Sequence, residues 1–205
     1  MSDVKPGQQP TLRAERAAVT HRRIAETARA MFSRQGYGAT TLTAIAAEAG
    51  VAVQTVYAVF GSKAGILHAL IGEVLHQPEA DTLYEDAMQA SGARQKLELF
   101  ARSIRRRWEY GHDVVAISGD AASTDPAVRT EVERVLGIRR AGIGRFAATL
   151  APAFAPGVDV DRANAILDAL TLPAVYAEFI DVHGWTPDEY KIWLATSLRR
   201  QLLRG

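Results

Sequence analysis

One short helix-forming stretch turns a largely uncharged face outward. Residues 51–63, VAVQTVYAVFGSK, have helical spacing, and Val56, Val59 and Phe60 fall on the side expected to pack into a core. The opposite side carries an amide, a phenol and small apolar groups, with no charge before Lys63. Amide and hydroxyl groups can hydrogen bond with the base edges and phosphates of DNA, and small apolar groups can lie against thymine methyl groups. The outward side chains are Val53, Gln54, Tyr57 and Ala58.

Each side chain of this stretch has a role that it could fill on DNA. Gln54 presents an amide that pairs well with the edge of an adenine. Val53 and Ala58 suit thymine methyl groups. Thr55 and Tyr57 carry hydroxyl groups that can reach phosphates. The uncharged face is therefore suited to reading bases, and flanking groups would hold the DNA backbone.

Phosphate contacts are expected on both sides of the stretch. Thr41 stands at the N-terminus of the preceding predicted helix, where a hydroxyl group and the helix dipole favour a phosphate. Lys63 opens the following helix and can bind a backbone phosphate as a point charge. The predicted DNA-binding residues are Thr41, Thr43, Val53, Gln54, Thr55, Tyr57, Ala58 and Lys63.

The sequence carries no catalytic or metal-binding pattern. It has no cysteine, which excludes disulfides, thiolate metal sites and thiol catalysis. Asp120 and Asp125 near His112 do not form a catalytic set, and no phosphate-binding loop, G-x-G-x-x-G, G-x-S-x-G or H-E-x-x-H motif occurs. The histidines lack metal-ligand spacing. We therefore expect no enzyme activity, no metal and no cofactor.

The composition is that of an ordinary globular protein with a basic N-terminal third. The 205 residues are 48% hydrophobic and 23% charged, enough for one large domain or two smaller ones. Residues 1–63 hold eight basic and four acidic side chains, whereas residues 64–205 hold 16 and 19. This asymmetry favours a polyanion as partner at one end. No signal-peptide core and no apolar run of about 20 residues occurs, so we predict a cytoplasmic protein without a membrane partner.

Two short predicted helices joined by a glycine form a helix-turn-helix. Thr41 is the expected N-cap of a helix over 42–49. Gly50 is the expected left-handed residue of a tight turn. A second helix then covers about 53–59, and Ala46, four residues before the glycine, lets the two helices cross closely. The motif spans about residues 41–60.

Helical periodicity continues through the rest of the chain, so the predicted fold class is all-α. We expect a kink at Pro173 inside one long helix over 160–184. A capping box with a proline at the first helical position is expected at residues 186–189. The other predicted helices are 12–35, one that Ser62 caps, 79–90, 93–110, 113–121, one that begins after the Asp125 cap and runs to about 150, and 187–203. The expected domains are a disordered tail (1–11), a three-helix DNA-binding domain (12–77) and a larger helical domain for ligand binding and dimerisation (78–205).

The helix-turn-helix resembles a known family. Residues 40–67, TTLTAIAAEAGVAVQTVYAVFGSKAGIL, preceded by ARAMFSRQGYGA at 28–39, are similar to the DNA-binding domain of the TetR family of transcriptional regulators. The resemblance covers about residues 19–75. It implies an all-α homodimer in which the N-terminal domain binds double-stranded DNA and the C-terminal domain binds a small effector. Three positions depart from the family pattern: His21, Ala52 and Val59 stand where arginine, serine and histidine are frequent.

The resemblance implies an effector pocket among the central helices. Aromatic and polar groups on adjoining predicted helices are the candidates, and Trp108 and Phe179 also fit ordinary core positions. An apolar or aromatic ligand is expected for such a lining. The candidate ligand-binding residues are Trp108, Tyr110, His112, Tyr176 and Phe179.

The predicted apolar faces of the last two helices are larger than one small domain is expected to bury, which favours a two-fold homodimer. Two recognition helices would then lie about 34 Å apart, or a multiple of that, and would read a pseudo-palindrome. Two basic clusters remain open in role. Arg105–Arg107 fits a solvated helix face or a second nucleic-acid patch, and the arginines between residues 13 and 23 fit a DNA-contacting arm or a solvated face.

Two functions follow from these observations. The first is a ligand-responsive, sequence-specific transcriptional regulator, a repressor that releases its operator when a small apolar or aromatic effector binds. The alternative is an all-α ligand carrier or enzyme whose DNA-binding module is vestigial.

Overall fold

The computed structural model describes residues 12–204, and every regular element in that range is a helix. The predicted tail, residues 1–11, lies outside the described residues. The chain forms two compact units, divided between Ala69 and Leu70. One helix, α4 (Lys63–Leu75), contributes residues to both units, so the division falls inside a helix. The all-α fold class is confirmed.

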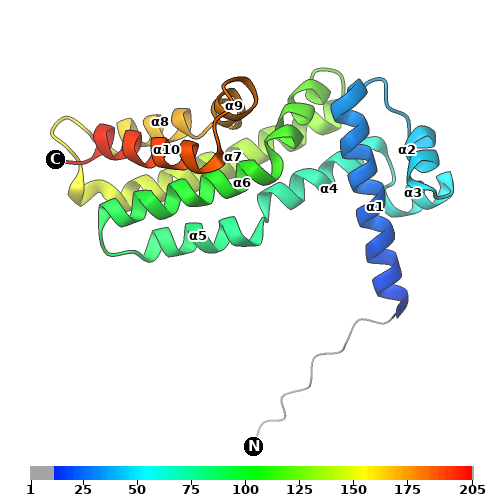
Figure 1. Cartoon of the computed structure of the whole chain (residues 1–205), viewed down its shortest axis with the longest axis horizontal. Coiled ribbons are helices and arrows are strands. Elements are labelled where there is room, and N and C mark those ends of the chain that lie inside the picture. The colour runs from blue at the N-terminus through cyan, green and yellow to red at the C-terminus, as the bar shows by residue number, and fades with distance from the viewer. Residues whose placement is uncertain (1–11, 205) are drawn as a thin grey trace, which may run out of the picture. The chain divides into compact units, whose positions relative to one another are not determined.

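The N-terminal unit packs three helices and the first half of α4 around one apolar core (Figure 1). Its helices are α1 (Leu12–Gln35), α2 (Leu42–Ala49) and α3 (Val53–Phe60). The buried face of α1 follows the predicted helical spacing, and α2, α3 and α4 each add apolar residues that are almost fully buried. The core side chains are Ile24, Ala28, Met31, Phe32, Ile45, Ala46, Val56, Ile66 and Leu67.

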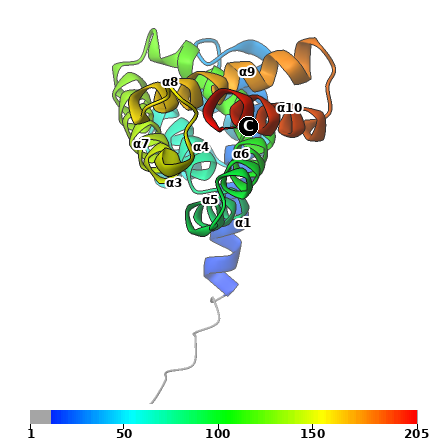
Figure 2. The same ribbon diagram turned by 90° about the vertical axis from the view of Figure 1, so that its left-hand side faces the viewer.

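The C-terminal unit is a bundle in which α6 is central. α6 packs against α5, α7, α9 and α10, and Figure 2 shows these helices nearly end-on, with α7 beside α8. A stacked pair of buried rings, Phe100 and Phe146, joins α6 to α7 with centroids 4.2 Å apart. The elements are α5 (Pro78–Gln89), α6 (Ala93–Ala122), α7 (Pro126–Leu150), a 3₁₀ turn η1 (Ala151–Ala153), α8 (Val160–Leu170), α9 (Pro173–Ala177), a π-helical turn η2 (Glu178–Val182) and α10 (Pro187–Leu202).

The helix starts are set by the capping residues that the sequence predicts. The Asp125 carboxylate accepts from the backbone N–H groups of Ala127 and Val128 at the start of α7. Thr186 and Glu189 form the reciprocal capping box of α10, with Pro187 at its first position. Each cap satisfies backbone donors that otherwise lack a partner in a first helical turn. These local predictions are confirmed.

Two predicted helix boundaries in the C-terminal unit are wrong. The segments 93–110 and 113–121 belong to the single helix α6, which crosses non-helical backbone at Gly111 (φ −151°, ψ 23°). The segment around Pro173 is not one kinked helix, because α8 ends at Leu170 and α9 starts anew at Pro173. Proline has no N–H to donate to the preceding turn but suits the first position of a helix.

Backbone hydrogen bonds tie the segment after α7 to the segment after α10. Ala155 donates its N–H to the Leu202 carbonyl at 2.9 Å, and Arg204 donates to the Ala153 carbonyl at 3.3 Å. Phe154 and Leu203 form an isolated antiparallel bridge between these bonds. We call this arrangement the terminal clasp; it encloses α8, α9 and α10.

Candidate functional site

Helices α2 and α3 form the turn that the sequence predicts. Gly50 ends α2 in the left-handed region (φ 64°, ψ 40°), where a glycine has no side-chain penalty. The N–H of the next residue, Val51, donates to the Ala46 carbonyl at 3.0 Å and closes the turn. The two helices are bent by 110° relative to each other, within the range of helix-turn-helix motifs.

The outer face of α3 is open and uncharged. Val56 is fully buried and fixes the rotation of this short helix on the unit. Gln54 and Ala58 are exposed, and the Tyr57 side chain is 54% exposed. Val53 and Thr55 are half-buried at the edges of the face. The predicted base-reading side chains therefore come together on one surface.

The prediction that Val59 packs into the core is wrong. Its side chain is 39% exposed, whereas Val56 is buried and Phe60 is half-buried with its ring 4.5 Å from that of His21. At 3.6 residues per turn, positions three and four residues after the buried anchor lie on opposite sides of it, about 60° and about 40° away, and the side of Phe60 is the one that faces the unit.

Thr40 and Thr41, at the start of the motif, have different roles. Thr41 is exposed, and its hydroxyl oxygen accepts the Ala44 N–H at 3.1 Å as the N-cap of α2. Its hydroxyl hydrogen can still be donated outward. Thr40 is buried and donates to the Gly36 carbonyl at 2.9 Å, which anchors the loop between α1 and α2. Thr43 is exposed on the first turn of α2.

Lys63 does not point to solvent as a phosphate contact would require. Its Nζ donates to the carbonyl of Tyr37 at 2.7 Å and to that of Thr40 at 3.0 Å, and it also lies 3.4 Å from the Gly38 carbonyl. The same ammonium group lies 4.2 Å from the centroid of the Tyr37 ring. Lys63 therefore holds the loop that leads into Thr41, and in this structure it acts by positioning the loop.

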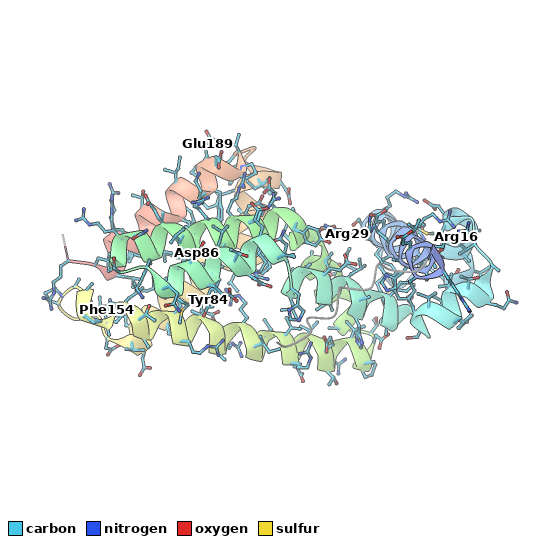
Figure 3. The ribbon with its side chains drawn as sticks, turned by 90° about the horizontal axis from the view of Figure 1, so that it is seen from below. Arg16, Arg29, Tyr84, Asp86, Phe154 and Glu189 are labelled. Carbon is cyan, nitrogen blue, oxygen red and sulfur yellow. The ribbon has the colours of Figure 1, made fainter. Side chains whose placement is uncertain are left out.

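The C-terminal unit contains a cavity of about 320 Å³ between the last turns of α4 and helices α5, α6 and α7. Its wall is mainly aliphatic and aromatic, which suits a small organic ligand. Tyr84 lies on the side of α5 that faces α7 and donates its hydroxyl hydrogen to the Gly142 carbonyl at 2.9 Å (Figure 3). The apolar lining consists of Ile71, Val74, Leu75, Phe100, Ile104, Trp108, Val114, Val115, Val135, Ile138 and Ile143.

Comparison with known proteins accounts for the N-terminal unit. Residues 24–70 match the sequence model of the bacterial regulatory proteins of the tetR family, and this range includes the whole of α2, the Gly50 turn and α3. The N-terminal unit is therefore similar to the DNA-binding domain of tetR-family regulators. The matched family consists of bacterial regulatory proteins. None of the curated protein sequences compared with the chain matches it.

Solved structures of several transcriptional regulators share the fold over most of the chain. NalD, the secondary repressor of the MexAB-OprM multidrug efflux pump in Pseudomonas aeruginosa, is 21% identical with a TM-score of 0.74, covering 93% of this chain and 99% of NalD. The fatty acid degradation regulator FadR from Bacillus halodurans is 16% identical with a TM-score of 0.72, covering 94% and 96%. The ketosteroid regulator KstR2 of Mycobacterium tuberculosis is 21% identical with a TM-score of 0.67, covering 90% and 95%.

Only one of the five predicted effector residues lines this cavity. Trp108 is in the wall, and its indole N–H donates to the Thr171 carbonyl at 3.0 Å. The hydroxyl of Tyr110 lies 2.9 Å from a Glu73 carboxylate oxygen at the surface. His112 lies between the Trp108 carbonyl and the Asp181 carboxylate. These positions place Tyr110 and His112 outside the cavity.

Tyr176 and Phe179 belong to an aromatic cluster around α10 instead of the cavity. The Tyr176 ring meets the Tyr190 ring edge-on with centroids 4.9 Å apart, and the Phe179 ring lies 4.5 Å from that of Trp193. Burial raises the pKa of Tyr176 to about 12. Helical periodicity shows that a ring is buried but not which of two neighbouring cores receives it.

Sequence reasoning missed the polar residues of the cavity wall. Arg107 donates to the carbonyls of Val74 and Leu75 at the end of α4, at 2.8 and 2.7 Å, and to the Asp81 carboxylate at 2.7 Å. Neither a solvated face nor a nucleic-acid patch describes Arg107. Its neighbours Arg105 and Arg106 do lie nearer the surface, in ion pairs with acidic side chains.

Two further properties concern the described part of the chain. Over residues 12–204, no group of three or more histidine, aspartate or glutamate side chains could hold a metal ion. In the same range, no single helix is long and apolar enough to cross a membrane, although the bent pair α2 and α3 together meets the length and composition criteria.

Proposed function

We propose that this chain is a sequence-specific repressor that releases its operator when a small apolar or aromatic effector enters the cavity of the C-terminal unit. The observation that supports the proposal most directly is the open, uncharged face of α3, held in place by the buried Val56. A helix face of this kind serves no purpose in packing, but it matches the edges of bases in the major groove.

The base-reading residues of the proposal are those on the exposed side of α3. Gln54 pairs with an adenine, and Val53 and Ala58 contact thymine methyl groups. The Tyr57 and Thr55 hydroxyls bind phosphates and set the position of the helix in the groove.

Backbone contacts at the start of α2 complete the proposed interface. Thr41 and Thr43 are exposed there, at a helix N-terminus that favours a phosphate. Lys63 supports this end indirectly through the carbonyls it binds, so its predicted direct phosphate contact is replaced by a positioning role.

The effector part of the proposal rests on the apolar cavity. A ligand that binds better to the DNA-free state than to the DNA-bound state lowers DNA affinity by the same factor. NalD is described as a repressor, and the processes named for the three similar proteins involve drugs, fatty acids and ketosteroids. These compounds are consistent with an apolar wall.

A homodimer through α8 and α10 is part of the same proposal, although most of the apolar stripe of α10 packs inside the chain itself. Tyr190, Leu194 and Leu198 of α10 are fully buried within the chain. The apolar groups that remain open near these helices include Leu172 at 40% and Ile192 at 61% exposure. A two-fold pair would present two α3 helices to successive major grooves, about 34 Å apart.

The experiment captures genomic DNA fragments on the purified full-length protein and measures the affinity of the best fragment at several salt concentrations. We expect one pseudo-palindromic site with an affinity that falls steeply with salt. Gln54→Ala should weaken this site by about 5- to 150-fold and relax its sequence preference at one base pair in each half-site. Tyr57→Phe should weaken all sequences alike, because it removes a phosphate contact.

Gln89→Ala is the matched control, since this glutamine is exposed at the end of α5 in the other unit. It should bind the operator like the unmodified protein. If Gln54→Ala and Tyr57→Phe also bind like the unmodified protein, α3 is not the reading helix. Weak and uniform binding to all fragments, together with tight binding of a small ligand, would leave a ligand carrier as the function.

A further inference from the structure

The cavity wall contains more positive than negative charge, and most of it is neutralised within the protein. The charged or titratable side chains in the wall are His76, Asp81, Tyr84, Arg107, Arg139 and Arg145. Arg107 donates to two carbonyls at the end of α4 and pairs with the Asp81 carboxylate. Arg139 forms an ion pair with the Asp168 carboxylate and donates to the Thr171 hydroxyl at 2.9 Å. Neither of these two arginines offers an uncompensated charge to a ligand.

Arg145 differs from the other two arginines of the wall. It is exposed on α7, and no carboxylate within residues 12–204 lies at ion-pair distance from it. Its guanidinium lies near the Tyr84 hydroxyl: a Cβ added at Gly142 would be 3.9 Å from both Arg145 Nη2 and the Tyr84 oxygen. The apolar cavity therefore has one polar edge, formed by a guanidinium and a phenol.

The Tyr84 hydroxyl is partly withdrawn from water at this edge. Burial raises the pKa of Tyr84, and the charge of Arg145 opposes that rise. The hydroxyl is therefore present in its neutral form, as a donor that now serves the Gly142 carbonyl. It could redirect this hydrogen bond toward a ligand atom placed beside the guanidinium.

We propose that the effector is an amphipathic anion whose apolar body fills the cavity and whose single acidic group binds Arg145 and the Tyr84 hydroxyl. The inference rests on the proposed function, because it takes the cavity to be the effector site. A guanidinium binds a carboxylate through parallel charge-assisted hydrogen bonds, which are roughly twice as strong as neutral ones. Arg145 repels a cationic ligand, and the Asp81 carboxylate cannot offset this because it is paired with Arg107.

The cavity is large enough for one small ligand but not for a bulky one. About 320 Å³ lies near the lower end of the range for ligand pockets, about 300–1,000 Å³. The apolar lining would contribute affinity in proportion to the hydrocarbon surface that it buries, and the acidic group would select among ligands of similar hydrocarbon size.

The test compares three probes that share one alkyl chain: dodecanoate, dodecanol and dodecylamine. Each displaces the neutral fluorescent compound N-phenylnaphthylamine from the full-length protein at about neutral pH, where the carboxylate and the amine are charged. We expect dodecanoate to bind about tenfold or more tightly than dodecanol, and dodecylamine to bind most weakly. Arg145→Gln should abolish the preference for dodecanoate and leave dodecanol binding unchanged, whereas Arg145→Lys should retain part of it.

Arg140→Gln is the matched control, because Arg140 is an exposed arginine of the same helix that does not line the cavity. It should keep the full preference. The inference is overturned if the unmodified protein does not prefer dodecanoate, or if Arg145→Gln keeps the preference. Equal binding of all three probes would overturn it while leaving the cavity as an effector site. Absence of binding by every probe would overturn both the inference and the effector part of the proposed function.

Discussion

Replacing Gly111 by alanine should destabilise the C-terminal unit, although Gly→Ala changes in helices usually stabilise. A Cβ at this position would lie 2.2 Å from Cγ2 of Val74 and 3.0 Å from its Cγ1. Gly111 and Val74 are both buried, so neither side chain can move into solvent. The valine is branched at Cβ and has little rotamer freedom with which to avoid the new methyl group.

The magnitude follows from the size of the overlap. A carbon–carbon contact of 2.2 Å must open by more than 1 Å to reach van der Waals distance, and the shift must be made by helix backbone rather than by a flexible side-chain end. Overpacking of this kind costs about 1–3 kcal/mol, and we expect a value near the upper end. For a chain of this length, the loss should lower the melting temperature by about 4–10 °C.

Tryptophan fluorescence is the suitable assay, because Trp108, Trp185 and Trp193 all belong to the C-terminal unit. Urea unfolding followed by this signal gives the free energy of unfolding of that unit. Gly119→Ala is the control: it lies in the same helix α6 with nothing within 4 Å of an added Cβ, and it should stabilise by about 0.5–1 kcal/mol.

A second-site change distinguishes the overlap from other causes. Val74→Ala alone should destabilise by about 1–2.5 kcal/mol, because it removes buried methyl groups. Combined with Gly111→Ala it should cost about 1–2 kcal/mol less than the sum of the two single changes, since the added methyl occupies the vacated space. Strict additivity, or a stabilising effect of Gly111→Ala alone, would refute the reasoning.

Two further predictions concern stability. Lys63→Met should destabilise the N-terminal unit by about 1–3 kcal/mol, measured as faster amide hydrogen exchange in that unit, because loop carbonyls lose a charged donor. Lys191→Met, which removes only a surface ion pair with Asp188, should have little effect. Glu189→Gln should lower the melting temperature at neutral pH, because bonds from Thr186 lower the pKa of the carboxyl in the folded state. That stabilisation is present above the unfolded pKa of about 4.3 and is lost as pH falls through the lower folded value, so the melting curves of the two proteins should converge in acid.

The sequence predicts the parts of the structure that depend on neighbours along the chain. Thr41, Gly50 and Thr186 each act through residues within about four positions, so the local pattern contains the whole interaction. The outward face of α3 was predictable for the same reason, because one buried anchor fixes the rotation of a short helix.

The residues of the cavity wall were not predictable, because the wall is assembled from four successive helices whose contacting residues are far apart in sequence. Tyr84 and Gly142 are hydrogen-bonded across 58 positions, and no periodic pattern contains that pairing. Arg107 shows the same limit: within a run of three arginines it is indistinguishable from its neighbours, yet it alone reaches the carbonyls at the end of α4. Lys63 likewise has a sequence position that suits a phosphate and a tertiary setting that occupies its donors.

The terminal clasp turns α8, α9 and α10 into one closed loop. One of its contacts, from the Arg204 side chain to the Phe154 carbonyl, joins residues 50 positions apart. Forming the clasp therefore costs the conformational entropy of closing a long loop. The three enclosed helices therefore cannot unravel one after another while the clasp holds; they open together as one cooperative segment. The amide hydrogens of Ala155 and Arg204, which lie in the clasp itself, should exchange with solvent at a rate that reports this joint opening.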